Sequence, residues 1–306
     1  MKLQADPLTP TRDSTTTRGL NPLSSEPRRL LIAFAHPDDE SFGMGGAIAH
    51  YVQQGVEVYL ICSTNGDAGT VPPDLIEKYG SVGELRLDEL RCAAETLGIK
   101  EVITFGYGDS GMMGSPDNQN PECLWQANED EVVGRIVHEI RRIRPQVVVT
   151  FDPFGGYGHP DHIYMHRATT RAFHEAGDPA RYLDDGLEPY QPKKLYYSAF
   201  PRLPLQLMIW MARLRGEDPR RMGTNQDLDL QAALEHRLPA HARLNVGKYQ
   251  SVWDAAAGCH ASQQSPRETQ SFLDKLRRVI FRHQEFTRAW PQPDGRIEHD
   301  LFEGIR

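Results

Sequence analysis

The sequence predicts an α/β fold with a doubly wound, mostly parallel sheet of the Rossmann-like type, helices on both faces and a less regular C-terminal part. Two observations support this prediction. Short apolar runs alternate along the chain with segments whose apolar residues recur at helical spacing. Strands that alternate with helices form parallel sheets through right-handed crossovers. In addition, polar clusters directly follow two of the apolar runs, where ligand sites form in such sheets.

Five strands are expected. The run 30–35 is apolar throughout, which is typical of a central parallel strand that is buried on both faces. The expected strands, in chain order, are 30–35, 56–62, 102–105, 147–151 and 194–200.

Helices are expected between and after these strands. Gly98 follows the segment 84–97 and suits the position just beyond a helix C-terminus. Arg144 precedes Pro145 and therefore ends the segment 129–143, because a residue before proline avoids helical backbone. Ser265 and Pro266 suit the start of a last helix. The expected helices are 45–53, 84–97, 129–143, 161–175, 205–214 and 266–288.

The chain of 306 residues fits one large α/β domain. Residues 1–28 are rich in Thr, Pro, Ser and Arg, and are expected to be a disordered tail. Residues 29–306 are expected to form a single domain. Within it, 201–246 is less regular and is expected to shape the substrate pocket or to contact another subunit, so a homo-oligomer is one possibility.

The composition excludes several partners. The formal net charge is −8 and no long basic run occurs, so neither nucleic acid nor an anionic membrane is expected as a partner. No apolar stretch approaches the roughly 18–20 residues of a membrane span. The four cysteines are far apart, and Cys62 and Cys92 lie in apolar patterns, so both are expected to be buried thiols. A reducing, cytoplasmic location is the simplest interpretation of that cysteine pattern.

The strongest chemical signal is His36-Pro37-Asp38-Asp39-Glu40, which directly follows the first expected strand. Carboxylates at a strand end destabilise the fold unless they bind a cation or accept several hydrogen bonds. The alternative is that Asp38 or Asp39 caps the following helix. A histidine with two aspartates in four residues favours a metal site over a cap.

A second cluster, His159-Pro160-Asp161-His162, follows the fourth expected strand. Pro160 suits the start of a helix, and histidines three residues apart on one turn can face the same cavity. Two histidines and an aspartate with an open fourth position suit a catalytic zinc. Iron can replace zinc in such a site, so Fe²⁺ in the cell stays an alternative.

These two motifs together resemble the LmbE-like (PIG-L) zinc N-deacetylase family. That family includes deacetylases of N-acetylglucosaminyl-inositol and N-acetylglucosaminyl-malate, and an amidase of mycothiol conjugates. The resemblance runs from about residue 30 to the C-terminus. Weaker matches extend it, and these are 86–90, 106–112 and 260–263.

The resemblance implies a role for individual residues of this chain. It implies zinc ligands at His36, Asp39 and His162. It implies that Asp38 is the general base and acid. It matches His159 to an oxyanion-stabilising or acid role, and Tyr157 to a mobile tyrosine that helps to polarise the carbonyl. The resemblance also matches two substrate-binding positions, which are Arg86 and Asp109.

The chemistry of amide hydrolysis is consistent with these roles. A bound zinc lowers the pKa of water to about 7, and a neighbouring carboxylate can move a proton from that water to the leaving amine. We expect Asp161 to hold the His159 ring in position. From spacing alone, Arg86 would be a solvated helix residue. The alternative to a substrate role for Arg86 and Asp109 is that they pair with each other as a salt bridge. The histidine of the last matching motif, His260, receives no role.

The sequence therefore predicts a zinc-dependent hydrolase that removes an acetyl group from a small N-acetylated sugar conjugate. Three alternatives stay open: an amidase of thiol conjugates, a metal-dependent phosphoesterase, and a carbohydrate-binding protein with a structural metal. A phosphoesterase would need more ligands than the two motifs supply. The sequence does not identify the physiological substrate.

Overall fold

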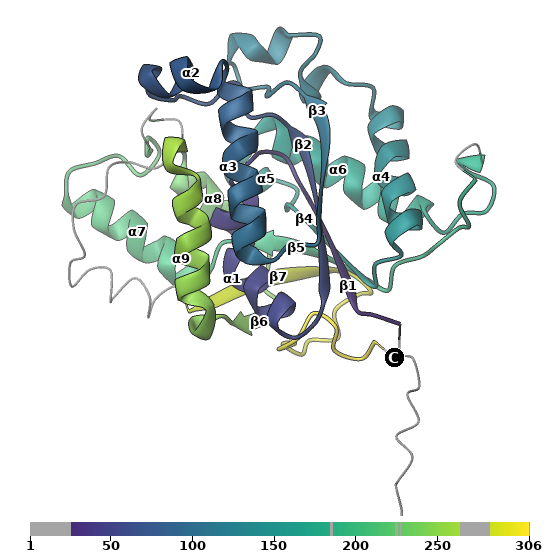
Figure 1. Cartoon of the computed structure of the whole chain (residues 1–306). Helices are drawn as coiled ribbons and strands as arrows, with labels where there is room; N and C mark the ends of the chain where they lie inside the picture. Colours follow the sequence, from purple (N-terminus) through teal and green to yellow (C-terminus); the bar gives the residue numbers. More distant parts are fainter. Residues whose placement is uncertain (1–25, 184–185, 224–225, 227, 264–281, 306) are drawn as a thin grey trace, which may run out of the picture.

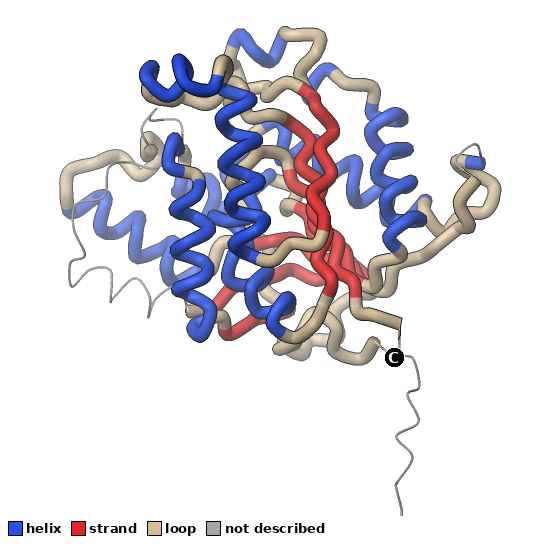
Figure 2. The backbone as a smooth tube through the Cα atoms, in the orientation of Figure 1, coloured by secondary structure: helices blue, strands red, loops and turns tan. Residues whose placement is uncertain are grey.

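All seven strands of the computed structural model belong to one sheet (Figure 2). The structure describes residues 26–183, 186–223, 226, 228–263 and 282–305, so the expected tail lies almost wholly outside the described residues. The strand order is β3-β2-β1-β4-β5-β7-β6. The strands are β1 (Arg29–Phe34), β2 (Glu57–Thr64), β3 (Glu101–Tyr107), β4 (Val147–Thr150), β5 (Lys194–Ala199), β6 (Ala242–Asn245) and β7 (His283–Trp290).

The first five strands are parallel, which confirms the predicted sheet. β1 pairs with β2 on one side and with β4 on the other, so that Leu31 lies opposite both Tyr59 and Val148. β7 runs antiparallel to β5, and β6 runs antiparallel to β7. The chain passes outward from β1 to β3 and then returns to the other side of β1 with β4. The strand order therefore reverses between β1 and β4, where ligands bind in doubly wound sheets.

Helices cover both faces of the sheet (Figure 1). α1, α3 and α9 pack together on one face, and α4 and α6 pack together on the other. The α-helices are α1 (Asp39–Gln53), α2 (Pro73–Tyr79), α3 (Val82–Leu97), α4 (Glu129–Ile143), α5 (Gly155–Gly158), α6 (Pro160–Glu175), α7 (Arg202–Leu214), α8 (Leu230–Glu235) and α9 (Gln250–Cys259). The 3₁₀ turns are η1 (Pro116–Gln119), η2 (Leu124–Gln126), η4 (Gly247–Tyr249) and η5 (Ala261–Gln263).

Local capping explains why the boundaries of α3 and α4 agree with prediction. The Ser81 side chain accepts a hydrogen bond from the backbone N–H of Glu84 at 3.1 Å, and α3 ends at Gly98 in a left-handed conformation. Asn128 caps α4 in the same way, and α4 ends at Arg144, directly before Pro145. Each of these signals acts within four residues, so the sequence alone carries them.

α1 begins at Asp39, six residues earlier than expected, so the first chemical motif runs directly into the helix. Its glycines allow α9 to approach closely. A Cβ atom at Gly45 would lie 2.5 Å from the Trp253 ring, and one at Gly46 would lie 2.9 Å from both Trp253 and Val246. A larger side chain at either position would push α9 away from α1.

The prediction of a helix over 266–288 is wrong in its last part. β7 begins at His283, where it pairs with both β5 and β6. Phe286 of β7 is buried in the core, so pairing and burial override the local helical pattern. The rest of the expected helix, residues 264–281, lies outside the described residues.

The prediction that Cys92 is a buried thiol is also wrong. Cys92 of α3 is exposed and forms a disulfide with Cys259 at the end of α9. Cys62 and Cys123 are buried free thiols. A separation of 167 residues hides the pairing from a sequence scan. The disulfide removes the premise on which a reducing compartment was inferred, and the cytoplasmic location stays a prediction.

Within the described part of the chain, no helix combines the length and the apolar character that a membrane crossing requires.

Candidate active site and metal centre

The two predicted motifs meet at the carboxyl ends of β1 and β4. His36 follows β1, and His159 and His162 lie at the start of α6, after the turn that follows β4. The ring centroid of His36 lies 4.4 Å from that of His159 and 5.1 Å from that of His162. Neighbouring parallel strands thus bring together side chains that are more than 120 residues apart in sequence.

Hydrogen bonds fix which ring nitrogens of His36 and His162 carry protons. Nδ1 of His162 lies 3.1 Å from the carbonyl oxygen of Gly155, and Nε2 of His36 lies 3.2 Å from Oδ2 of Asp161. Carbonyl and carboxylate oxygens only accept, so these two nitrogens carry the protons in the neutral rings. In the neutral rings Nδ1 of His36 and Nε2 of His162 are therefore unprotonated, and they face each other at 3.1 Å.

The Asp39 carboxylate completes this cluster. Its Oδ1 lies 3.2 Å from Nε2 of His162, and its Oδ2 lies 3.5 Å from Nδ1 of His36. Unprotonated nitrogens and carboxylate oxygens repel one another at such distances unless a proton or a metal ion lies between them. Tetrahedral zinc with bonds of about 2.0–2.1 Å places neighbouring ligand atoms roughly 3.3–3.4 Å apart. The donor set of His36, Asp39 and His162 therefore fits a metal ion.

Other groupings of nearby donors fit a metal less well. The ring nitrogens of His36, His159 and His162 approach within 4.8 Å of one another, and His36, Asp109, His159 and Asp161 form a second group. Both groups include His159, whose Nδ1 accepts the backbone N–H of Asp161 at 3.2 Å. Its remaining nitrogen therefore carries the proton in the neutral ring and points a donor into the site.

The carboxylates beside His36 orient its ring. Asp161 is fully buried, and its Oδ2 accepts the Ser110 backbone N–H at 2.9 Å while its Oδ1 accepts the Ser110 hydroxyl. Oδ1 of Asp109 lies 3.4 Å from the same His36 nitrogen. A carboxylate on the outer nitrogen of a ligand histidine is the usual support of a metal site.

The Asp161 carboxylate therefore contacts the ring of His36, whereas it is the backbone N–H of Asp161 that holds the ring of His159. Burial alone would lower the pKa of His36, but Asp109, Asp161 and Asp39 raise it well above its usual value. Ser110 was missed by the sequence analysis. Its only signal was its place in the 106–112 match.

Asp38 has the backbone conformation that a catalytic group often shows. Its φ of 119° lies in the region that favours glycine, at a cost of about 1–3 kcal/mol for other residues. It stands at the N-cap of α1, yet within the described residues its carboxylate caps no backbone N–H of that helix. Burial raises the pKa of this carboxyl to about 6, although Arg86 lowers it. The capping alternative is therefore not supported.

The Arg86 side chain is buried, with 4% of its surface exposed, and its partners are internal. Nη2 donates to Oδ2 of Asp38 at 2.9 Å and to the carbonyl oxygen of Pro37, and Nη1 donates to Gly66 at 3.1 Å. Among the described residues, no ion pair joins Arg86 to Asp109. Arg86 is therefore not the solvated helix residue that its spacing indicates. Its guanidinium is also not free to contact a substrate, because it is held by internal partners. Arg86 instead holds Asp38.

We expect Arg86→Gln to lower kcat more than it raises KM, because the glutamine cannot hold Asp38 and the two carbonyl oxygens together. Steady-state kinetics with a thermal melt of the same preparation measure both effects. A rise in KM with unchanged kcat would instead favour the substrate-binding role.

His159 and Tyr157 complete the candidate site. His159 is the N-cap of α6, and its Nε2 lies 3.8 Å from Oδ1 of Asp109. Burial and the charges of His36 and His162 lower the pKa of His159 well below its usual value. The Tyr157 ring lies 5.0 Å from that of His162 and 6.1 Å from that of His159. Burial raises the pKa of Tyr157, so its hydroxyl stays a donor at neutral pH.

A glycine is required where the β4–α6 turn passes His162. Gly155 has a φ of 68°, and a Cβ atom there would lie 2.8 Å from the Cβ of His162. The close approach is the one that brings the Gly155 carbonyl oxygen to the His162 ring. Any side chain at this position would shift the turn and with it His162.

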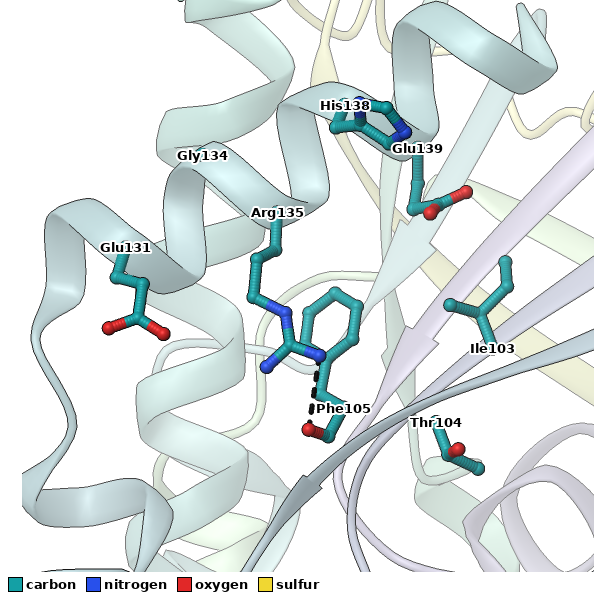
Figure 3. A pocket seen from close by; sticks show the side chains of 8 residues that line it. All are labelled: Ile103, Thr104, Phe105, Glu131, Gly134, Arg135, His138 and Glu139. Carbon is teal, nitrogen blue, oxygen red and sulfur yellow. Dashed lines mark hydrogen bonds between the residues drawn. The ribbon is translucent and has the colours of Figure 1, made fainter. Parts of the chain in front are cut away.

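A separate surface groove of about 540 Å³ lies between β3 and α4 (Figure 3). Arg135 crosses it, stacks on the Phe105 ring at 4.0 Å and donates to the Phe105 carbonyl oxygen at 3.0 Å. None of the predicted site residues lines this groove, so its size does not make it the active site. Arg135 covers backbone at the sheet edge, which discourages pairing with another strand.

A cluster of histidines and carboxylates at the switch point of a mostly parallel sheet, beside an aspartate with a strained backbone, is typical of a metal-dependent enzyme. Residues 31–173 match the PIG-L family, described as GlcNAc-PI de-N-acetylase. The chain belongs to this family and is a deacetylase, which confirms the predicted family and enzyme class.

Several relatives that match most of the chain share the name 1D-myo-inositol 2-acetamido-2-deoxy-alpha-D-glucopyranoside deacetylase. The relative from Streptomyces scabiei is 43% identical over 93% of this chain and 92% of its own length. The relative from Geodermatophilus obscurus is 40% identical over 77% of this chain and 83% of its own length.

Solved structures share the fold at lower identity. N,N'-diacetylchitobiose deacetylase from Pyrococcus horikoshii matches with a TM-score of 0.60 and 20% identity, over 90% of this chain and 88% of that one. The 4-carboxy-2-hydroxymuconate hydratase GalB of Pseudomonas putida matches with a TM-score of 0.55 and 18% identity, over 87% and 97%. Because a hydratase shares the fold, the fold alone does not specify the reaction.

Proposed function

We propose that this enzyme uses zinc to remove the acetyl group from the 2-acetamido group of an N-acetylglucosaminyl-inositol. The observation that carries the proposal is the convergence of two imidazole nitrogens and a carboxylate beside the half-buried carboxyl of Asp38. The names of the relatives support the sugar part of the proposal. No observation favours the amidase alternative, and membership in a deacetylase family argues against a carbohydrate-binding protein.

The residues that would hold the metal are His36 through Nδ1, His162 through Nε2 and Asp39 through its carboxylate. When bound, zinc supplies Lewis-acid chemistry, acidifying a water molecule and polarising the amide carbonyl. Contacts to the ring nitrogens that would not bind the metal orient two of these ligands. Asp161 and Asp109 hold Nε2 of His36, and the carbonyl oxygen of Gly155 holds Nδ1 of His162.

Asp38 is the proton carrier in this proposal. Arg86 engages Oδ2, and we assign proton transfer to Oδ1. Oδ1 takes a proton as water attacks the acetamide carbon and gives it to the nitrogen of the leaving amine. Because Asp38 adjoins the ligand Asp39, its carboxylate can lie beside the metal without binding it.

Two donors face the oxygen on which negative charge develops. Nε2–H of neutral His159 and the hydroxyl of Tyr157 would each donate a hydrogen bond to it. His159 acts in its neutral form, because burial and the neighbouring rings lower its pKa.

We expect His159→Ala and Tyr157→Phe each to lower kcat by about 10²–10³-fold and to change KM little, because these donors act mainly in the transition state. The measurement is steady-state kinetics of acetate release, with zinc content as the control for an intact metal site. An effect on KM alone would assign both residues to ordinary substrate binding.

The sugar hydroxyls need contacts away from the reacting bond. Asp109 stays a proposed hydroxyl acceptor, with 8% of its surface exposed; Arg86 keeps that role only if the Arg86→Gln test shows a pure KM effect. A small sugar conjugate is thus the proposed partner, and a homo-oligomer in the cytoplasm stays a prediction.

The substrate proposal is tested with the purified, zinc-loaded enzyme on three N-acetylated compounds, measured by acetate release. These are N-acetylglucosaminyl-inositol, N-acetylglucosaminyl-malate and N,N'-diacetylchitobiose. We expect kcat/KM to be at least about tenfold higher on the inositol conjugate, which is roughly 1.4 kcal/mol of discrimination. Equal rates on all three would overturn the inositol assignment, and no release from any would overturn the deacetylase proposal itself.

A further inference from the structure

Two fully buried ionisable side chains, Glu40 and His260, have no part in the mechanism above. Both have 0% of their surface exposed. Oε1 of Glu40 accepts a hydrogen bond from Nε2 of His260 at 2.7 Å, and Oε2 of Glu40 accepts the backbone N–H of Asp38 at 3.0 Å. A single carboxylate thus connects the His260 ring to the backbone of the proposed base.

We propose that His260 is a positioning residue for the deacetylation, acting through Glu40 on the backbone of Asp38. The inference rests on the proposed role of Asp38 as proton carrier. His260 orients the Glu40 carboxylate, and Glu40 in turn holds the Asp38 N–H. Two contacts therefore orient Asp38: Glu40 holds its backbone N–H, and Arg86 holds its carboxylate.

Asp38 needs such a clamp because its φ of 119° is one that non-glycine residues rarely adopt. A strained backbone persists only where its surroundings hold it. The Glu40 carboxylate receives three donors: Ser41 Oγ at 2.6 Å, His260 Nε2 and the Asp38 N–H. Without His260, the Glu40 carboxylate can turn into the vacated space and release the Asp38 N–H.

The fold anchors His260 on both sides to one face of α3. Cys259, the preceding residue, is bonded to Cys92. Ser262, two residues further on, donates through its backbone N–H at 2.8 Å and its hydroxyl at 2.7 Å to Glu89. Arg86, Glu89 and Cys92 follow one another at intervals of three residues on α3. One face of this helix therefore contacts both the Asp38 carboxylate and the segment that carries His260.

The first test compares His260→Ala with His260→Gln in the full-length, zinc-loaded enzyme. A glutamine Nε2–H can replace the histidine Nε2–H toward Glu40, whereas alanine cannot. We expect the alanine variant to lower kcat by about 10–100-fold at nearly unchanged KM and zinc content, and the glutamine variant to recover most of that loss. The matched control is His241→Ala, which removes a half-buried histidine that accepts the Arg288 N–H in another part of the fold.

The second test is a double-mutant cycle with Asp38→Asn. If His260 acts only through Asp38, then His260→Ala lowers kcat much less in the Asp38→Asn background than in the wild type. A merely structural role predicts a lower melting temperature, the same loss in both backgrounds and no rescue by glutamine. That pattern overturns the proposal, as does an unchanged kcat in His260→Ala.

Failure of the proposed function gives a different result. In that case the wild-type enzyme releases no acetate from any substrate, or Asp38→Asn keeps wild-type turnover. An active wild-type enzyme that depends on Asp38 but not on His260 contradicts this inference alone.

Discussion

Replacing Asp38 by asparagine is expected to lower kcat by about 10²–10⁴-fold while leaving the bound metal in place. General acid–base catalysis by a positioned side chain contributes a factor of this size. Asparagine is nearly isosteric, tolerates the left-handed backbone of this position and keeps an oxygen for Arg86. It cannot take up a proton, so the variant separates proton transfer from geometry.

Acetate release and metal content are measured on the same preparation. The matched control is Asp88→Asn, since Asp88 is an exposed aspartate of α3 that pairs with Arg91 outside the site. We expect the control to retain wild-type turnover. Wild-type turnover in Asp38→Asn would mean that another group moves the proton.

Removing the metal is expected to abolish activity, and zinc is expected to restore it. The ring nitrogens of His36 and His162 and the carboxylate of Asp39 converge at 3.1–3.5 Å, an arrangement that a bound cation satisfies. Chelation followed by titration with zinc or iron under anaerobic conditions measures both the dependence and the metal preference. Full activity after complete removal of metal would contradict the proposed zinc dependence.

The variant His162→Ala tests the same metal site by removing a ligand instead of the metal. We expect it to lose metal as well as activity, because it removes one of three ligands. His138→Ala is the control: this histidine lines the surface groove between β3 and α4, away from the cluster (Figure 3). Metal retained at wild-type affinity in His162→Ala would assign the site to other residues, such as the second group around Asp109 and Asp161.

The clamp around Asp38 suggests how the fold supports this chemistry. α3 contacts Asp38 directly through Arg86. It also holds the segment around His260, through the hydrogen bonds of Glu89 to Ser262 and the disulfide of Cys92 with Cys259. The disulfide ties α9 to the same helix. A change on the α3 face could therefore alter turnover without touching a metal ligand.

The sequence alone determined the parallel core and the edge of the sheet that carries the site. The apolar run of β1 predicted a central strand, and in the structure β1 lies between β2 and β4. The polar motifs after β1 and β4 then had to meet, because parallel neighbours end at the same sheet edge. The boundaries of α4 agreed with prediction because its caps lie next to it in sequence.

Only the tertiary structure decided which carboxylate holds which ring, and which residues hold Asp38. The Asp161 carboxylate supports His36 across the sheet edge, and only the backbone N–H of Asp161 contacts the neighbouring His159. The strand β7 formed where the end of a helix was predicted. Cys92 forms a disulfide with Cys259, which is 167 residues away in the sequence. The physical reason is range. Periodicity and capping act within a few residues, whereas the partner of a buried polar group is whatever donor or acceptor the packed chain brings within about 3 Å of it.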